Sequence, residues 1–141
     1  MSKYAYLRPL VTPNFIFDFP SQFEIKKINE FISGNYNQTV KIANQNMQAI
    51  MSGSQLIWYI QSKNNNQIVG KLNLTFTNQE LNTADIECFL SEELTDSQIL
   101  EISQRVVHIC TTNLELKDIN IINSLNKITC QELKNHYNIG Q

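Results

Sequence analysis

Residues 54–77, SQLIWYIQSKNNNQIVGKLNLTFT, decide the fold, because they contain two strand-like runs joined by a short polar connection. SKNNN has the length and polarity of a hairpin loop. Along the second run apolar and polar side chains alternate, as in a sheet with one drier face. The apolar set of this run is Ile68, Gly70, Leu72, Leu74 and Phe76.

The same pattern continues for one more strand and then changes to a helical period. ADIECFL (84–90) follows the polar turn NQELNT and predicts a third hairpin-linked strand. A long helix is predicted from Thr95, since Thr95 and Gln98 form a capping box. On this helix Glu101 and Arg105 have the i, i+4 spacing of a surface ion pair.

The chain before these strands predicts one strand and two helices. YAYLRPLV (4–11) is read as a strand that prolines bring to an end. A helix is predicted within residues 19–34, with a capping box at Ser21 and Glu24 and a C-cap at Gly34. A second helix is predicted from Thr39, followed by Gly53.

After the long helix, KDINIIN (117–123) predicts a short apolar strand, and TCQELKNHYNIG a last helix capped by Thr129 and Glu132. The predicted order is β-α-α-β-β-β-α-β-α. This order indicates an α+β fold in α/β/α layers, with a mostly antiparallel central sheet flanked by helices.

Composition indicates one domain over residues 1–141 and argues against several partners. With 11 basic and 13 acidic side chains and a net charge of −2, no basic stripe is available for nucleic acid. No stretch is apolar and long enough for a signal peptide or a membrane span, so we expect a cytoplasmic protein with no membrane partner. The three cysteines show no C-x-x-C spacing, which predicts buried thiols with neither a disulfide framework nor a metal site.

Four segments in this order resemble the GNAT superfamily of acetyltransferases, and within it the branch of ribosomal-protein and amino-acid N-acetyltransferases. The resemblance covers nearly the whole chain. The segments are YLRPLVTP (6–13), LIWYIQSKNNNQIVGKLNL (56–74), ADIECFLSEEL (84–94) and INIINSLNKIT (119–129).

The resemblance implies a GNAT fold and transfer of an acetyl group from acetyl-CoA to an amine, either a small amine or a protein N-terminus. It implies Asp85 or Glu87 as the general base and Tyr137 as the group that protonates the leaving thiolate. Asn123 and Asn126 are alternatives for the asparagine that follows the family's fifth strand. The residues alone also allow Asp85 and Glu87 to be solvated carboxylates and Tyr137 to be a packing residue.

The cofactor turn of the family follows the pattern R-x-x-G-x-G/A, and here Thr95-x-x-Gln98-x-Leu100 stands in its place. Thr95, Asp96, Ser97 and Gln98, with Asn126, are therefore the candidate acetyl-CoA contacts. Side chains in place of glycines keep a ligand away from the backbone, and nearby carboxylates repel phosphate. We expect impaired or lost cofactor binding; alternatively, Thr95 and Asp96 serve only as a helix cap.

Two functions therefore remain open: an unusual N-acetyltransferase, or a catalytically silent GNAT-fold module that binds a ligand or protein. The sequence also predicts that the two final strands of the branch are missing, because few residues follow the last helix. The strand INIIN would then have an open apolar edge. We expect a second copy or another protein to cover it.

Overall fold

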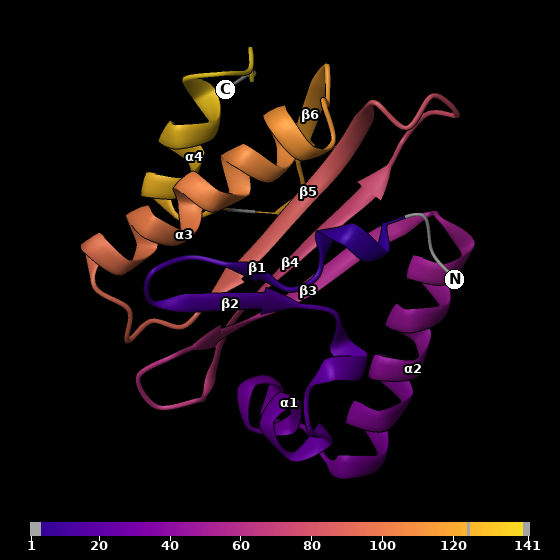
Figure 1. Cartoon of the computed structure of the whole chain (residues 1–141), viewed down its shortest axis with the longest axis vertical. Coiled ribbons are helices and arrows are strands. Elements are labelled where there is room, and N and C mark those ends of the chain that lie inside the picture. Colours follow the sequence, from indigo (N-terminus) through magenta and orange to yellow (C-terminus); the bar gives the residue numbers. More distant parts are fainter. Residues whose placement is uncertain (1–3, 124, 140–141) are drawn as a thin grey trace.

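A six-stranded sheet forms the centre of the computed structural model, which describes residues 4–123 and 125–139 (Figure 1). The strands lie in chain order across the sheet and pair antiparallel, except that β5 and β6 are parallel. They are β1 (Leu10–Val11), β2 (Phe15–Asp18), β3 (Gln55–Ser62), β4 (Ile68–Phe76), β5 (Thr83–Leu90) and β6 (Asp118–Ile121). The predicted hairpin-linked strands and the mostly antiparallel sheet are confirmed.

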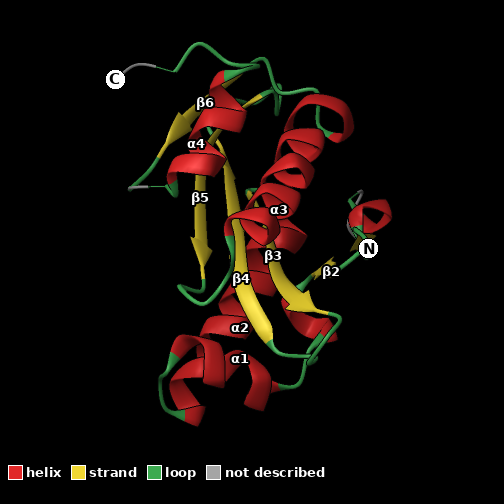
Figure 2. Cartoon of the chain, turned by 90° about the vertical axis from the view of Figure 1, so that its left-hand side faces the viewer, coloured by secondary structure: helices red, strands yellow, loops and turns green. Residues whose placement is uncertain are grey.

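Helices cover both faces of this sheet, which confirms the α/β/α layering. In Figure 2, α3 (Asp96–His108) and α4 (Lys127–Lys134) lie in front of the strands, and α2 (Tyr36–Ser52) passes behind β4. The shorter α1 (Ile25–Ile32) packs with α2 and against β4. A single π-helical turn (Ile109–Asn113) extends α3. Within the described ranges, no helix combines the length and apolar character needed to cross a bilayer.

Strand alternation separates a dry face from a polar face. Trp58, Leu72 and Cys88 are register partners across β3, β4 and β5, and all three side chains are buried. The next position along each strand points to the opposite face. There Tyr59 pairs with Lys71, and Asn73 pairs with Glu87. The polar side of the sheet is therefore built by the same alternation that builds the core.

The N-terminal segment differs from its prediction of one strand over residues 4–11. It contains a 3-10 turn at Ala5–Leu7, then β1, and β2 follows as a strand that the sequence reading missed. The prolines at positions 9 and 13 flank β1 and limit it to two residues. Arg8 Nε donates to Asp18 Oδ1 at 2.7 Å, which joins the first turn to β2.

The predicted capping box at Ser21 and Glu24 is wrong, because Pro20–Gln22 form a separate 3-10 turn and α1 begins at Ile25 without a side-chain cap. This helix ends at Ser33, with a left-handed φ of 60°, and not at Gly34. Helix α2 begins earlier than Thr39, because the Asn35 side chain accepts a hydrogen bond from Gln38 N. Gly53, with φ 82°, ends it as predicted.

The ion pair predicted between Glu101 and Arg105 is also wrong. Glu101 instead accepts hydrogen bonds from Thr12 Oγ1 at 2.6 Å and from the backbone N–H of Asn14 at 2.8 Å. Burial raises the pKa of Glu101, but the hydrogen bonds from the Asn14 side chain, Thr12 and the Asn14 backbone, with the charge of Lys63, outweigh it, and the pKa lies below its ordinary value. Glu101 thus ties α3 to the loop before β2.

The cap predicted at Thr129 is replaced by a tertiary contact. Thr129 is buried and shares a hydrogen bond of 2.7 Å with Ser103, which joins α4 to α3. Glu132 therefore has no capping partner there. Asn126 caps α4 through a hydrogen bond from Ile128 N at 2.8 Å.

Candidate functional site

The candidate site begins where β5 and β6 separate. The two strands are paired from Thr83 and Asp118 to Ile86 and Ile121, and a last hydrogen bond joins Ile122 N to Ile86 O at 3.0 Å. Strand β5 continues to Leu90, so its last residues have no partner strand on the β6 side. Their backbone groups are the donors and acceptors that a ligand between the strands could use.

A cleft of about 510 Å³ occupies this separation. Cys88 is one of its lining residues, and burial raises the pKa of this thiol to about 12, so it is not a thiolate nucleophile at neutral pH. Among the described residues that line the cleft, none is lysine or arginine. The lining is formed by Cys88, Phe89, Leu90, Ser91, Glu92, Leu94, Asp96, Ile99 and Asn126.

The turn from β5 into α3 satisfies most of its own backbone donors. Thr95 N donates to Gln98 Oε1 at 2.9 Å, and Gln98 N donates to Thr95 Oγ1 at 3.2 Å, which confirms the predicted capping box. Glu93 N donates to Ser91 Oγ and Leu94 N to Ser91 O, each at 3.3 Å. These bonds leave few donors for an anion.

The first two amides of α3, those of Asp96 and Ser97, are the ones that the capping box leaves unused. They emerge beside the carboxylates of Asp96 and Glu92, both of which line the cleft. The helix N-terminus favours an anion by about 0.3–1 kcal/mol. Two like charges nearby repel an incoming phosphate. The free energy of this repulsion is comparable to, or larger than, the gain from the helix N-terminus.

A neighbouring cleft of about 850 Å³ continues the negative surface toward α1. Glu30, Glu92 and Glu93 line it. Lys27 lines it as well, and its ammonium donates to the backbone oxygen of Asn66 at 2.7 Å. The three carboxylates therefore outnumber the lysine in this cleft.

Asp85 and Glu87 lie on the polar face of β5, where both are half-buried. Asn120 Nδ2 donates to Asp85 Oδ1 at 3.4 Å, and Asn123 Nδ2 donates to Glu87 Oε2 at 2.5 Å. Each predicted general base therefore has an amide partner on or just after β6. Of the two asparagines considered, Asn123 meets Glu87, whereas Asn126 caps α4.

Lys71 was not predicted as a site residue, but the structure places it beside these carboxylates. Burial lowers its pKa, and the charge of Glu87 partly opposes that shift. The Lys71 ammonium is 5.2 Å from the centre of the Tyr59 ring, within cation–π range. The alternation of residues 68–76 already placed Lys71 on the polar face, which is the sequence signal that could have identified it.

The polar face also contains buried groups without hydrogen-bond partners. Tyr59 Oη, Asn73 Oδ1 and Asn46 Nδ2 are buried and make no hydrogen bond of standard geometry in the described structure. Burial raises the pKa of Tyr59 to about 12, and nearby Asn46 lowers it in part. Such groups cost stability when they remain unpaired. The hydrogen-bonding groups of the polar face are therefore less completely paired than those of the turn.

Tyr137 is not brought to the cleft. Its side chain is buried in the core, and its hydroxyl donates to Leu116 O at 3.0 Å. Burial raises the pKa of this hydroxyl.

Cys110 is also buried, as predicted, whereas Cys130 is only half-buried. Over residues 4–123 and 125–139, no cluster of three or more histidine, cysteine or carboxylate side chains could hold a metal ion.

The sheet with its separated parallel strands, and helices on both faces, is the GNAT acetyltransferase fold. A candidate ribosomal-protein-serine acetyltransferase from Vibrio cholerae is similar with a TM-score of 0.72 and 11% identity, over 89% of this chain and 79% of that one. The acetyltransferase from Salmonella typhimurium that modifies the N-terminal serine of ribosomal protein L7/L12 gives 0.69 and 11%, over 89% and 81%.

A third solved structure, the microcin C7 self-immunity acetyltransferase MccE in complex with acetyl-CoA and AMP, is similar with a TM-score of 0.64 and 14% identity. The similarity covers 86% of this chain and 78% of that one. No protein-family model matches the sequence, and no curated protein matches it. The likeness therefore lies in the fold, which confirms the predicted GNAT architecture.

Proposed function

We propose that this chain is an acetyltransferase-like domain that has lost ordinary acetyl-CoA binding and acts as a catalytically silent module for a ligand or protein partner. The observation that carries the proposal is the capping box, in which Thr95 and Gln98 use the backbone donors that a diphosphate would need. Its solved neighbours are acetyltransferases, and MccE holds acetyl-CoA. The residues at the corresponding turn here do not fit that cofactor.

The energetic comparison supports this proposal. A charge-assisted hydrogen bond contributes about 1.5–3 kcal/mol, so two donors withdrawn by the capping box remove several kcal/mol of potential phosphate binding. Opening the capping box to release them costs about 0.5–2 kcal/mol. The dipole of α3 adds at most about 1 kcal/mol. The capping box therefore lowers the gain from phosphate binding without cancelling it, and the repulsion from the carboxylates of Glu92 and Asp96, which line the cleft, supplies the rest of the penalty.

The second candidate is an N-acetyltransferase with weak cofactor affinity, acting on a small amine or a protein N-terminus. The pairing of Glu87 with Asn123 next to the strand separation favours it, because a positioned carboxylate suits a general base. Asp85 is the alternative base. In the silent domain these carboxylates only hold β5 and β6 together.

Calorimetric titration with acetyl-CoA separates the two candidates. We expect no binding heat from the parent protein at millimolar cofactor. A variant with Thr95→Arg, Gln98→Gly, Leu100→Ala, Glu92→Gln and Asp96→Asn should gain measurable affinity, because it removes the cap and both cleft carboxylates. Glu80→Gln, a change at an exposed carboxylate in the β4–β5 turn, is the matched control and should leave the parent's lack of binding unchanged.

Micromolar binding by the parent would retire the silent-domain proposal. In that case Glu87→Gln decides whether the bound cofactor is used. Loss of amine acetylation in Glu87→Gln, with unchanged acetyl-CoA affinity, would establish the second candidate.

A further inference from the structure

Strand β6 is an edge of the sheet that is longer than the opposite edge and has its charged residues, Lys117 and Asp118, at one end only. It pairs with β5 on one side only, and Figure 2 shows it as the outermost strand. The opposite edge, β1, is only two residues long and is flanked by prolines. Short length and proline are common devices that prevent edge pairing. In contrast, β6 has four residues, and two of them are isoleucines.

The backbone of β6 presents hydrogen-bonding groups to the outside. Ile122 N donates to Ile86 O, so the residues at even positions direct their N–H and C=O groups toward β5. The backbone groups of Ile119 and Ile121 therefore point away from the sheet. Asp118 Oδ1 accepts from Ile119 N at 3.0 Å, a part-buried contact that an incoming strand has to replace.

A groove of about 530 Å³ lies along this edge and provides room for a further strand. Its walls come from β6, from α4 and from the segment after α4. Cys130 and Lys134 are its α4 residues, and Ile139 contributes apolar surface from the C-terminal segment. A groove of this kind suits an extended chain better than a compact ligand, because one wall is an unpaired strand.

We infer that a second copy of this chain occupies the edge, with the two β6 strands antiparallel about a two-fold axis at Asn120. In this register Ile119 of each copy faces Ile121 of the other, and their outward backbone groups form about four hydrogen bonds. The two Asn120 side chains meet on the axis. Asp118 faces Ile122 of the second copy.

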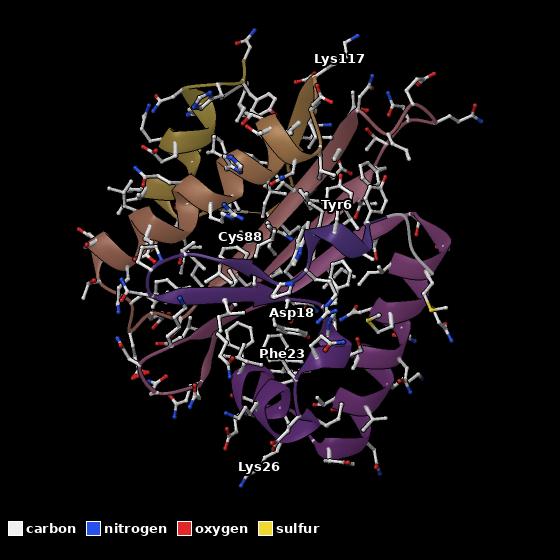
Figure 3. All side chains as sticks on the ribbon, in the orientation of Figure 1. Tyr6, Asp18, Phe23, Lys26, Cys88 and Lys117 are labelled. Atoms are coloured by element: carbon white, nitrogen blue, oxygen red, sulfur yellow. The ribbon has the colours of Figure 1, made fainter. Side chains whose placement is uncertain are left out.

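The sequence of β6 is complementary to itself in this arrangement. Isoleucine faces isoleucine on the dry side of the sheet, and amide faces amide on the polar side. Lys117 and Asp118 both lie where β6 begins, and Figure 3 shows Lys117 at the outer tip of the molecule. Because the two-fold axis relates the two β6 strands, the charges of the two copies lie at opposite ends of the paired strands. Like charges therefore do not face each other.

Disulfide trapping tests the register. In a Cys130→Ser background, Asn120→Cys should form an intermolecular disulfide, because residues facing each other at a non-hydrogen-bonded antiparallel site have Cα atoms about 4.5 Å apart. Asp118→Cys is the matched control on the same exposed edge. Its two copies would lie about 13 Å apart and should not crosslink. Equal crosslinking of both variants, or of neither, would overturn the register.

Sedimentation over micromolar to sub-millimolar concentrations tests the dimer itself. The parent should show a concentration-dependent dimer, and Asn120→Lys should lose it, because two ammonium groups would meet on the axis. Asn37→Lys, an equal charge change on exposed α2, should keep the dimer. A parent that stays monomeric, or an Asn120→Lys variant that dimerises like the parent, contradicts the inference; circular dichroism confirms that each variant is folded.

Discussion

The turn into α3 and the polar face of the sheet are both rich in polar groups, but they satisfy them differently. At the turn, Thr95 and Gln98 bond to each other's backbone. On the sheet face, Tyr59 Oη and Asn73 Oδ1 are buried and make no hydrogen bond of standard geometry among the described residues, although the Asn46 side chain lies near Tyr59 Oη, and Lys71 is desolvated. One region is closed by its own side chains, and the other retains unmet hydrogen-bonding capacity.

This difference indicates where hydrogen-bonding groups of the fold remain unpaired. A phosphate site needs donors that the protein leaves unpaired, and the turn has paired most of its own. Polar groups that stay unpaired in a folded protein cost stability and are often functional. The proposed loss of cofactor binding therefore concerns the turn and not the face that carries Asp85 and Glu87.

The largest change in stability is expected at Gly70, which holds the end of β5 in place just before the turn. A Cβ at Gly70 would lie 2.9 Å from Leu90 Cδ2 and 3.1 Å from Phe89 O. Gly70→Ala should therefore lower the free energy of unfolding by about 1–3 kcal/mol in denaturant titrations. Gly34→Ala, whose nearest contact would be an ordinary 3.4 Å, is the control and should change it little. Equal effects would show that β5 is not held rigidly at its end.

The next effect concerns the closed turn. Thr95→Ala removes the acceptor for Gln98 N and should lower the free energy of unfolding by about 0.5–2 kcal/mol. Thr95→Ser keeps the hydroxyl and should retain most of the stability. If Thr95→Ala is as stable as the parent in chemical denaturation, the turn is not stabilised by its cap. The proposed difference between the turn and the polar face would then be wrong.

The polar face of the sheet should respond in the opposite direction. Tyr59→Phe removes a buried hydroxyl that has no standard hydrogen bond, so stability should stay unchanged or rise by up to about 1 kcal/mol. Thermal denaturation of both hydroxyl deletions under the same conditions compares the regions directly. A loss in Tyr59→Phe equal to that in Thr95→Ala would mean that the hydroxyl is satisfied after all.

The smallest effect is the pH dependence contributed by Lys71. Its folded-state pKa is lowered, so folding disfavours the ammonium form, and this penalty is present while Lys71 is protonated in both states. The penalty disappears as pH rises through the folded pKa toward 10.5. Lys71→Met should reduce the corresponding gain in stability at alkaline pH, whereas Lys26→Met, at an exposed position, should not. Identical pH profiles would contradict the desolvation of Lys71.

Sequence reasoning worked best where a single local pattern fixes the structure. The alternation in residues 68–76 and the capping box at Thr95 depend on near neighbours, and both are confirmed. It failed where tertiary contacts determine which partner a side chain bonds to. The Glu101 side chain bonds to the loop before β2 and not to Arg105, and the Thr129 side chain bonds to Ser103 and does not cap α4. No local pattern carries either partner.

The same limit applies to the candidate site. The positions of Asp85 and Glu87 on one strand face followed from the strand period, but their amide partners lie on or just after a strand more than 30 residues away. Tyr137 lies next to Leu116 because the segment after α4 packs into the core, a packing contact that spacing does not encode. Lys71 could have been found from its place on the polar face.

The most direct test of the closed turn is an amide NMR titration of the parent protein with acetyl-CoA. The account predicts that the resonances of Asp96, Ser97 and Gln98 do not shift up to millimolar cofactor, because the turn offers too few free donors in a negative surrounding. Saturable shifts confined to these amides would show that a diphosphate binds there and would contradict the central claim.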